Sequence, residues 1–136
     1  MSKDTLWASW FVSGPEHKVF HSGDSGYSPY FKQIGEKFAN IDLSLIKVGN
    51  YGLDLGWEDI HMVPENSVKA HLDIGAKIML PIHWGVFKLS NHDWDEPIEI
   101  TVIAAKKNNI KLVTSRLGEL VEYGKLLSNH FWWREL

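Results

Sequence analysis

The 136-residue sequence contains no cysteine, which excludes disulfide bonds and thiolate metal sites. No apolar run is long enough to cross a membrane, and the first residues, MSKDTLWASW, show no signal-peptide pattern. We therefore expect a cytoplasmic protein without a transmembrane segment. The 14 basic and 17 acidic residues give a net charge of -3, which argues against a surface for nucleic acid.

The residues that are present are typical of a globular protein. Hydrophobic residues make up 44% of the chain and charged residues 23%. The length suits a single domain, residues 1–136, with a core of its own. Seven tryptophans are many for this length, and their large aromatic surfaces must be buried in a core or against a partner.

Strand patterns alternate with helix patterns along the chain. The predicted strands are residues 5–13, 18–23, 43–49 and 77–83, and the predicted helices are residues 30–39, 64–75 and 97–109. Residues 111–115 and 119–123 are predicted to form a closing hairpin. This alternation predicts the α/β class.

Two of the predicted strands are apolar on both faces. The segment KIMLPIH has apolar side chains at odd and even positions, and so does LWASWFV. Such strands need cover on both faces of the sheet. The predicted helices can cover one face, whereas no other part of the sequence predicts a second layer.

Three polar side chains that could form a functional site follow predicted strands. Asp24 lies in the loop HSGDSGYSP, His61 in the loop after the strand at 43–49, and His83 ends the strand at 77–83. One carboxylate and two imidazoles suit an oxygen and nitrogen metal site, for example a zinc site. The alternative is that Asp24 caps a turn and that the histidines are structural. His71, inside the second helix, is predicted to have a structural or surface role.

Three segments, in order, carry a resemblance to a known family. VFHSGDSGYSPYFKQIGEKF, HMVPENSVKAHLDIGAK and PIHWGVFKLS resemble the C-terminal half of a metallo-β-lactamase-fold hydrolase. The closest branch contains N-acyl-phosphatidylethanolamine-hydrolysing phospholipase D and its bacterial relatives. The resemblance implies half of an αββα sandwich, with one mixed sheet and helices on one face. An exposed inner sheet face would require a partner.

The resemblance also implies roles for individual residues. Members of the family hold two metal ions, usually zinc, with iron or manganese as alternatives, and the two ions share a bridging water. Asp24 would bridge both metals and His83 would be a ligand of one. His61 would contact the substrate phosphate, so Asp24 and His61 are the predicted catalytic residues. Tyr27 is predicted to line the mouth of the site or, equally, to serve packing.

The family's main metal motif, His-x-His-x-Asp-His, does not occur in the 136 residues. Two functions are therefore open. The chain is the C-terminal portion of a zinc-dependent hydrolase of small-molecule or lipid phosphodiesters, like a phospholipase D, completed by a separate N-terminal half. Alternatively, it is an inactive half-domain that persists as a homodimer. On either hypothesis we expect the chain alone to be inactive, and it is open whether it binds any metal alone.

Overall fold

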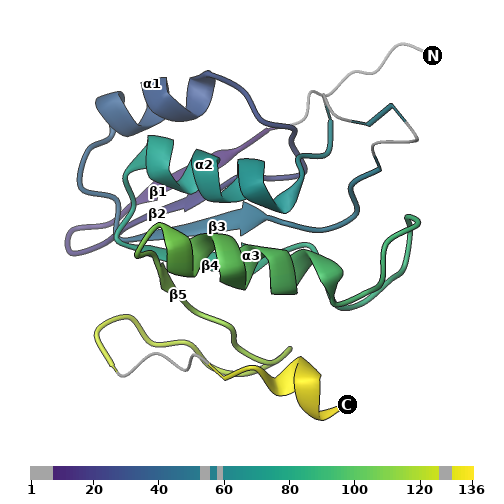
Figure 1. Cartoon of the computed structure of the whole chain (residues 1–136). Coiled ribbons are helices and arrows are strands. Elements are labelled where there is room, and N and C mark those ends of the chain that lie inside the picture. Colours follow the sequence, from purple (N-terminus) through teal and green to yellow (C-terminus); the bar gives the residue numbers. More distant parts are fainter. Residues whose placement is uncertain (1–7, 53–55, 58–59, 126–129) are drawn as a thin grey trace.

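The computed structural model describes residues 8–52, 56–57, 60–125 and 130–136. These residues form a five-stranded sheet in the order β1-β2-β3-β4-β5 (Figure 1). The strands are β1 (Trp10–Ser13), β2 (Lys18–His21), β3 (Leu43–Lys47), β4 (Ile78–Ile82) and β5 (Lys111–Leu112). β1 and β2 form an antiparallel hairpin, and the remaining neighbours pair in parallel. The predicted mixed sheet is confirmed.

Helices connect the parallel strands, as parallel pairing requires. They are α1 (Tyr30–Lys37), α2 (Pro64–Ile74) and α3 (Glu96–Lys107), and a short 3-10 helix, η2 (Trp132–Glu135), lies near the C-terminus. Pro64 occupies the first turn of α2, and Gly75 ends this helix with a φ of 69°, which glycine adopts without strain. Among the described residues, no helix combines the length and the apolar character that a bilayer crossing requires.

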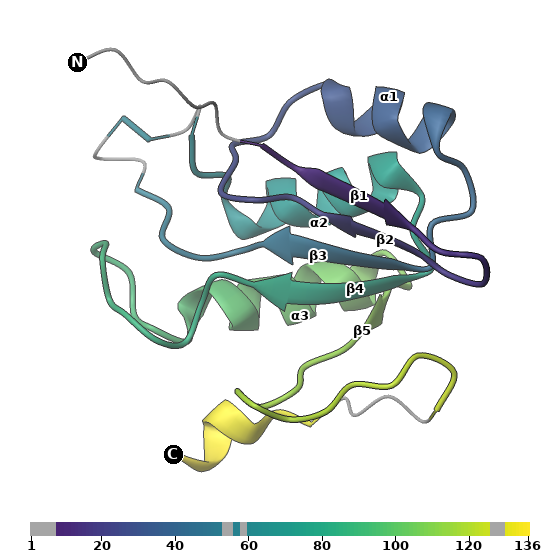
Figure 2. The same ribbon diagram turned by 180° about the vertical axis from the view of Figure 1, so that it is seen from behind.

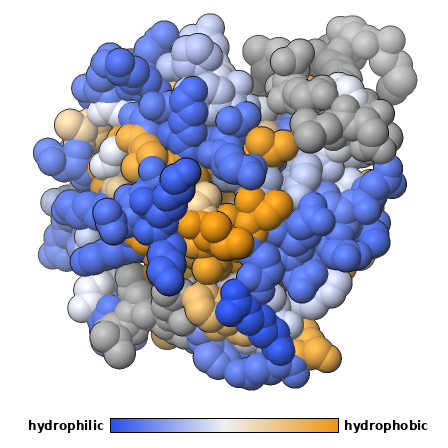
Figure 3. Space-filling model, viewed as in Figure 1, coloured by the Kyte–Doolittle hydropathy of each residue, from blue (hydrophilic) through white to orange (hydrophobic). Residues whose placement is uncertain are grey.

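The core lies between the sheet and the three helices. Phe20, Ile46 and Met79 point from neighbouring strands into a buried cluster that Val68 and Ile74 of α2 complete. All three helices cover this one face of the sheet (Figure 1), and seen from their side the surface is largely hydrophilic, with a hydrophobic patch near its middle (Figure 3). The prediction of helices on one face is therefore confirmed.

The other face of the sheet has no helical layer in the described part of the chain (Figure 2). Leu43, Leu45 and Leu80 are only partly buried, because strand alternation turns them away from the core. Trp10 and Val12 on the edge strand β1 are 66% and 62% exposed. An apolar sheet face is thus left without cover by the residues described.

The predicted closing hairpin is wrong. Residues 111–112 form β5, which pairs in parallel with β4, and residues 119–123 are not a strand. The turn between the two segments is present, because the N–H of Arg116 donates to Glu119 Oε2 at 2.7 Å, but the residues after it are held elsewhere. The Tyr123 hydroxyl donates a hydrogen bond to Asp42, which lies just before β3. Of the first predicted strand, residues 5–7 lie outside the described residues.

The C-terminal segment packs against α3. Trp133 is 2% exposed, and its indole N–H donates to Glu99 Oε1 at 2.8 Å. Arg134 binds both carboxylate oxygens of Glu99 at 2.6 Å. Trp84, which follows β4, stacks on Trp132 at 5.5 Å between ring centroids. These contacts bury part of the tryptophan surface within the domain.

Candidate functional site

The loop after β2 is held tightly against the N-terminal segment. Gly23 has a φ of +64°, and a Cβ added to it would lie 2.3 Å from the backbone oxygen of Ala8, so glycine is required there. The N–H of Gly23 donates to His21 Nδ1 at 2.9 Å. This fixed turn places Asp24 just past the end of β2, with its side chain 54% exposed.

Lys47 at the end of β3 lies directly beside Asp24. Its side chain is 0% exposed, and its Nζ lies 2.6 Å from Asp24 Oδ1. The backbone of Lys47 is fixed on both sides, because its N–H donates to Ser22 Oγ at 3.0 Å and its carbonyl accepts from Ser67 Oγ at 2.6 Å. A fully buried ammonium therefore points at a half-exposed carboxylate.

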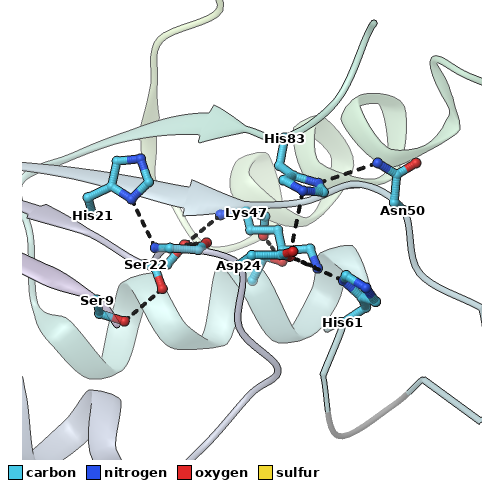
Figure 4. A network of polar contacts seen from close by, with 10 residues as sticks. Ser9, His21, Ser22, Asp24, Lys47, Asn50, His61 and His83 are labelled. Carbon is cyan, nitrogen blue, oxygen red and sulfur yellow. Dashed lines mark hydrogen bonds and ion pairs between the residues drawn. The ribbon is translucent and has the colours of Figure 1, made fainter. Parts of the chain in front are cut away.

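Two imidazoles converge on the same carboxylate oxygen (Figure 4). His61 Nδ1 lies 3.3 Å from Asp24 Oδ1, and His83 Nε2 lies 3.6 Å from it. His61 Nδ1 is buried and has no hydrogen-bond partner within the described residues. The structure thus brings together the three polar residues that sequence analysis singled out, and adds Lys47, which it missed.

The backbone at His83 is unusual. His83 has a φ of 65°, in the left-handed region that non-glycine residues seldom occupy. A Cβ on Gly49 would lie 2.2 Å from the carbonyl oxygen of His83, so the two loops approach as closely as glycine permits. Asn50 Nδ2 lies 3.4 Å from His83 Nδ1. Strained backbone of this kind is common at functional sites.

Burial and charge act in opposite directions on Lys47. Burial lowers the pKa of the Lys47 ammonium below its usual 10.5, since the charged form loses its hydration. The hydrogen bond and the charge of Asp24 oppose this shift. Asp24 is therefore the group that supports a positive charge at Lys47.

Asp24, His61 and His83 have suitable chemistry for a metal ion such as zinc. Their arrangement, however, does not match that of a metal site. Among the residues that the structure describes, no group of three or more histidine, aspartate or glutamate side chains is placed to hold a metal ion. The closest cation to Asp24 Oδ1 is the Lys47 ammonium. These residues do not by themselves fit a metal ion.

Two further residues from the sequence analysis have partners other than Asp24. The hydroxyl of Tyr27 donates to Asp73 Oδ2 of α2 at 2.6 Å, and Lys69 lies 4.4 Å over the Tyr27 ring. The role of Tyr27 at the mouth of the site stays a prediction, and a packing role is the alternative. His71 is 3% exposed and lies 2.8 Å from Ser44 Oγ, which is the structural role expected for it.

The chain is similar to known proteins in sequence and in fold. The sequence profile of the beta-lactamase superfamily domain matches residues 1–84. An uncharacterized protein of Mycobacterium tuberculosis is 41% identical over 133 residues, which cover 96% of this chain and 35% of the relative. The N-acyl-phosphatidylethanolamine-hydrolyzing phospholipase D 1 of Caenorhabditis elegans is 28% identical over 123 residues, or 86% of this chain and 35% of the relative.

Among solved structures, the metallo hydrolase Igni18 from Ignicoccus hospitalis has the same fold. It superposes with a TM-score of 0.63 at 21% identity, covering 82% of this chain and 43% of Igni18. The chain belongs to the metallo-β-lactamase-fold superfamily of metal-dependent hydrolases. It spans about a third of the length of the two curated relatives named above.

Proposed function

We propose that this chain provides the C-terminal part of a zinc-dependent hydrolase site that acts on phosphodiesters. Asp24 and His83 supply metal ligands, His61 contacts the substrate phosphate, and the remaining ligands come from outside these 136 residues. The observation that carries the proposal is the convergence of both imidazoles on Asp24 Oδ1, at 3.3 and 3.6 Å. Zinc, when bound, supplies a water of lowered pKa for hydrolysis.

The phosphodiester class is supported by the polar groups and by the relatives. The N–H group of the His61 imidazole, which lies beside Asp24, suits an anionic phosphoryl group. The relative from Caenorhabditis elegans bears the name of a phospholipase D, an enzyme that cleaves phosphodiesters. Both arguments indicate a class of substrate, and neither indicates one molecule.

The open sheet face supports a partner. Leu43, Leu45 and Leu80 are partly exposed on the face that the helices leave free, and an apolar face of this kind is stabilised by a second layer. A second sheet, from an N-terminal half, would provide both the cover and the missing ligands. The second candidate is an inactive homodimer, which the Lys47–Asp24 pair favours because an ammonium already neutralises the carboxylate.

Complementation distinguishes the two candidates. The chain is mixed with the part of the Mycobacterium tuberculosis relative that lies outside the matched 133 residues, and hydrolysis of bis(p-nitrophenyl) phosphate is followed with added zinc. The proposal predicts activity in the mixture and none in either part. Asp24→Asn lowers the rate of the mixture by roughly a hundredfold. Asp93→Asn, on an 81% exposed side chain, is the matched control and leaves the rate unchanged.

Activity of the chain alone, or equal rates for the Asp24→Asn and unmodified mixtures, would contradict the proposed function. A mixture without activity, together with a stable dimer of the chain in analytical ultracentrifugation, would support the inactive homodimer.

A further inference from the structure

The buried ammonium of Lys47 and both histidines share one carboxylate oxygen of Asp24. Its Nζ lies on Oδ1, the same oxygen that His61 Nδ1 and His83 Nε2 approach. We propose that Lys47 is the resident cation of Asp24 and competes with divalent metal ions for the cluster of Asp24, His61 and His83.

The position of Lys47 is fixed by the fold. Its side chain is 0% exposed, and besides Asp24 its Nζ has no polar partner within the described residues. Ser22 and Ser67 bind the Lys47 backbone from two sides, so a shift of the end of β3 would break both hydrogen bonds. The ammonium cannot leave Asp24 without remaining buried and uncompensated, which is costly.

A metal ion at this cluster would meet a like charge. Zinc bound to a carboxylate oxygen lies about 2 Å from it, whereas the Lys47 ammonium lies 2.6 Å from Oδ1. A zinc ion and the Lys47 ammonium on the same oxygen would repel each other strongly, because solvent screens charges only in part at a partly buried position. One positive charge on Lys47 thus substitutes for the metal that Asp24 would otherwise bind.

This inference deepens the proposed function and rests on its assignment of Asp24 and His83 as metal ligands, but it is tested on the chain alone. In a completed site, a metal ion must compete with Lys47 for Asp24. Lys47 would therefore lower the metal affinity of the whole hydrolase. A failed complementation assay would leave the result on the isolated chain unaffected.

The test is a calorimetric zinc titration of the 136-residue chain and its variants. The unmodified chain is expected to bind zinc weakly or not at all at this cluster. Lys47→Met removes the charge and keeps an apolar chain of similar length, and it should tighten zinc binding by at least about tenfold. Lys47→Gln is the second neutral variant, in case the methionine variant does not fold, and Lys47→Arg keeps the charge and should show no gain.

Two controls locate the effect. Lys77→Met removes an exposed ammonium from an ion pair with Asp42, before the start of β3, and should leave zinc binding unchanged. Adding Asp24→Asn to Lys47→Met should abolish the gain, because the carboxylate ligand is lost. The inference is overturned if the unmodified chain binds zinc as tightly as the neutral variants and loses this binding in Asp24→Asn.

Discussion

The two ends of β3 each carry a lysine–aspartate pair, and burial is reversed between them. At the end of the strand, Lys47 is 0% exposed and its partner Asp24 is 54% exposed. Before its start, Asp42 is 8% exposed and its partner Lys77 is 58% exposed. The distances are nearly the same, 2.6 and 2.7 Å, so the difference lies in which charge is buried.

The buried partner decides what each pair can do. Asp42 also accepts hydrogen bonds from the Lys18 N–H at 2.9 Å and the Tyr123 hydroxyl at 3.1 Å. The hydrogen bond from Lys77 and that of Lys18 lower the pKa of Asp42 to about 2, so this carboxylate is a satisfied structural anchor. Asp24 instead has a solvent-exposed side and faces imidazoles, which makes its end of β3 the place for chemistry.

The largest effect is expected from removing the charged partner of the buried Lys47 ammonium. Asp24→Asn should lower the free energy of unfolding by about 3 kcal/mol, because Lys47 keeps a buried charge without a charged partner. Urea unfolding measures the change. Adding Lys47→Met should restore most of the loss, and an unaltered stability of Asp24→Asn would show that Lys47 does not depend on this carboxylate.

A smaller loss is expected where the two site loops meet. Gly49→Ala should cost about 2 kcal/mol, because the new Cβ would lie 2.2 Å from the His83 carbonyl oxygen. Thermal unfolding and the NMR signals of the His83 ring follow the change. Gly14→Ala is the control, since its Cβ would make an ordinary contact at 3.5 Å. Equal effects of both variants would argue against a tight contact at His83.

At the other end of β3, acid should reveal the role of Asp42. Its pKa of about 2 lies below the ordinary 3.8, so its contribution to stability is present above pH 3.8 and is lost as the pH falls through about 2. Asp42→Asn should lower the stability near neutral pH by about 1–2 kcal/mol. This difference from the unmodified chain should shrink between pH 4 and pH 2 in urea unfolding, and a constant difference would contradict the account.

The smallest effect is expected at the exposed ammonium. Lys77→Met should change the midpoint of urea unfolding least among these variants, because Lys77 is exposed and Asp42 keeps its hydrogen bonds from the Lys18 N–H and the Tyr123 hydroxyl. A high salt concentration should shift the midpoint of urea unfolding equally for the unmodified chain and for this variant. A loss as large as that of Asp24→Asn would remove the contrast between the two ends of the strand.

Much of this arrangement follows from the sequence. The alternation of strand and helix patterns predicted the α/β class. Asp24, His61 and His83 follow predicted strands, where functional residues tend to collect, so they were singled out as one possible site. Lys47 was missed, although a lysine ending the apolar run LSLIK was a visible signal. Its complete burial is a property of the folded domain, in which Ser22 and Ser67 from distant segments bind the Lys47 backbone.

The hairpin of residues 111–115 and 119–123 was predicted from local pattern alone. Residues 119–123 are not a strand, and the Tyr123 hydroxyl binds Asp42 instead.

The most direct measurement of the central claim is NMR of the lysine side-chain ammonium groups. The account predicts that the Lys47 ammonium gives a slowly exchanging signal, because it is buried and bound to Asp24, and that this signal is absent or strongly shifted in Asp24→Asn. Added zinc should leave the signal of the unmodified chain in place. A Lys47 signal that exchanges as fast as that of Lys77, or that zinc displaces at low concentration, would contradict the account.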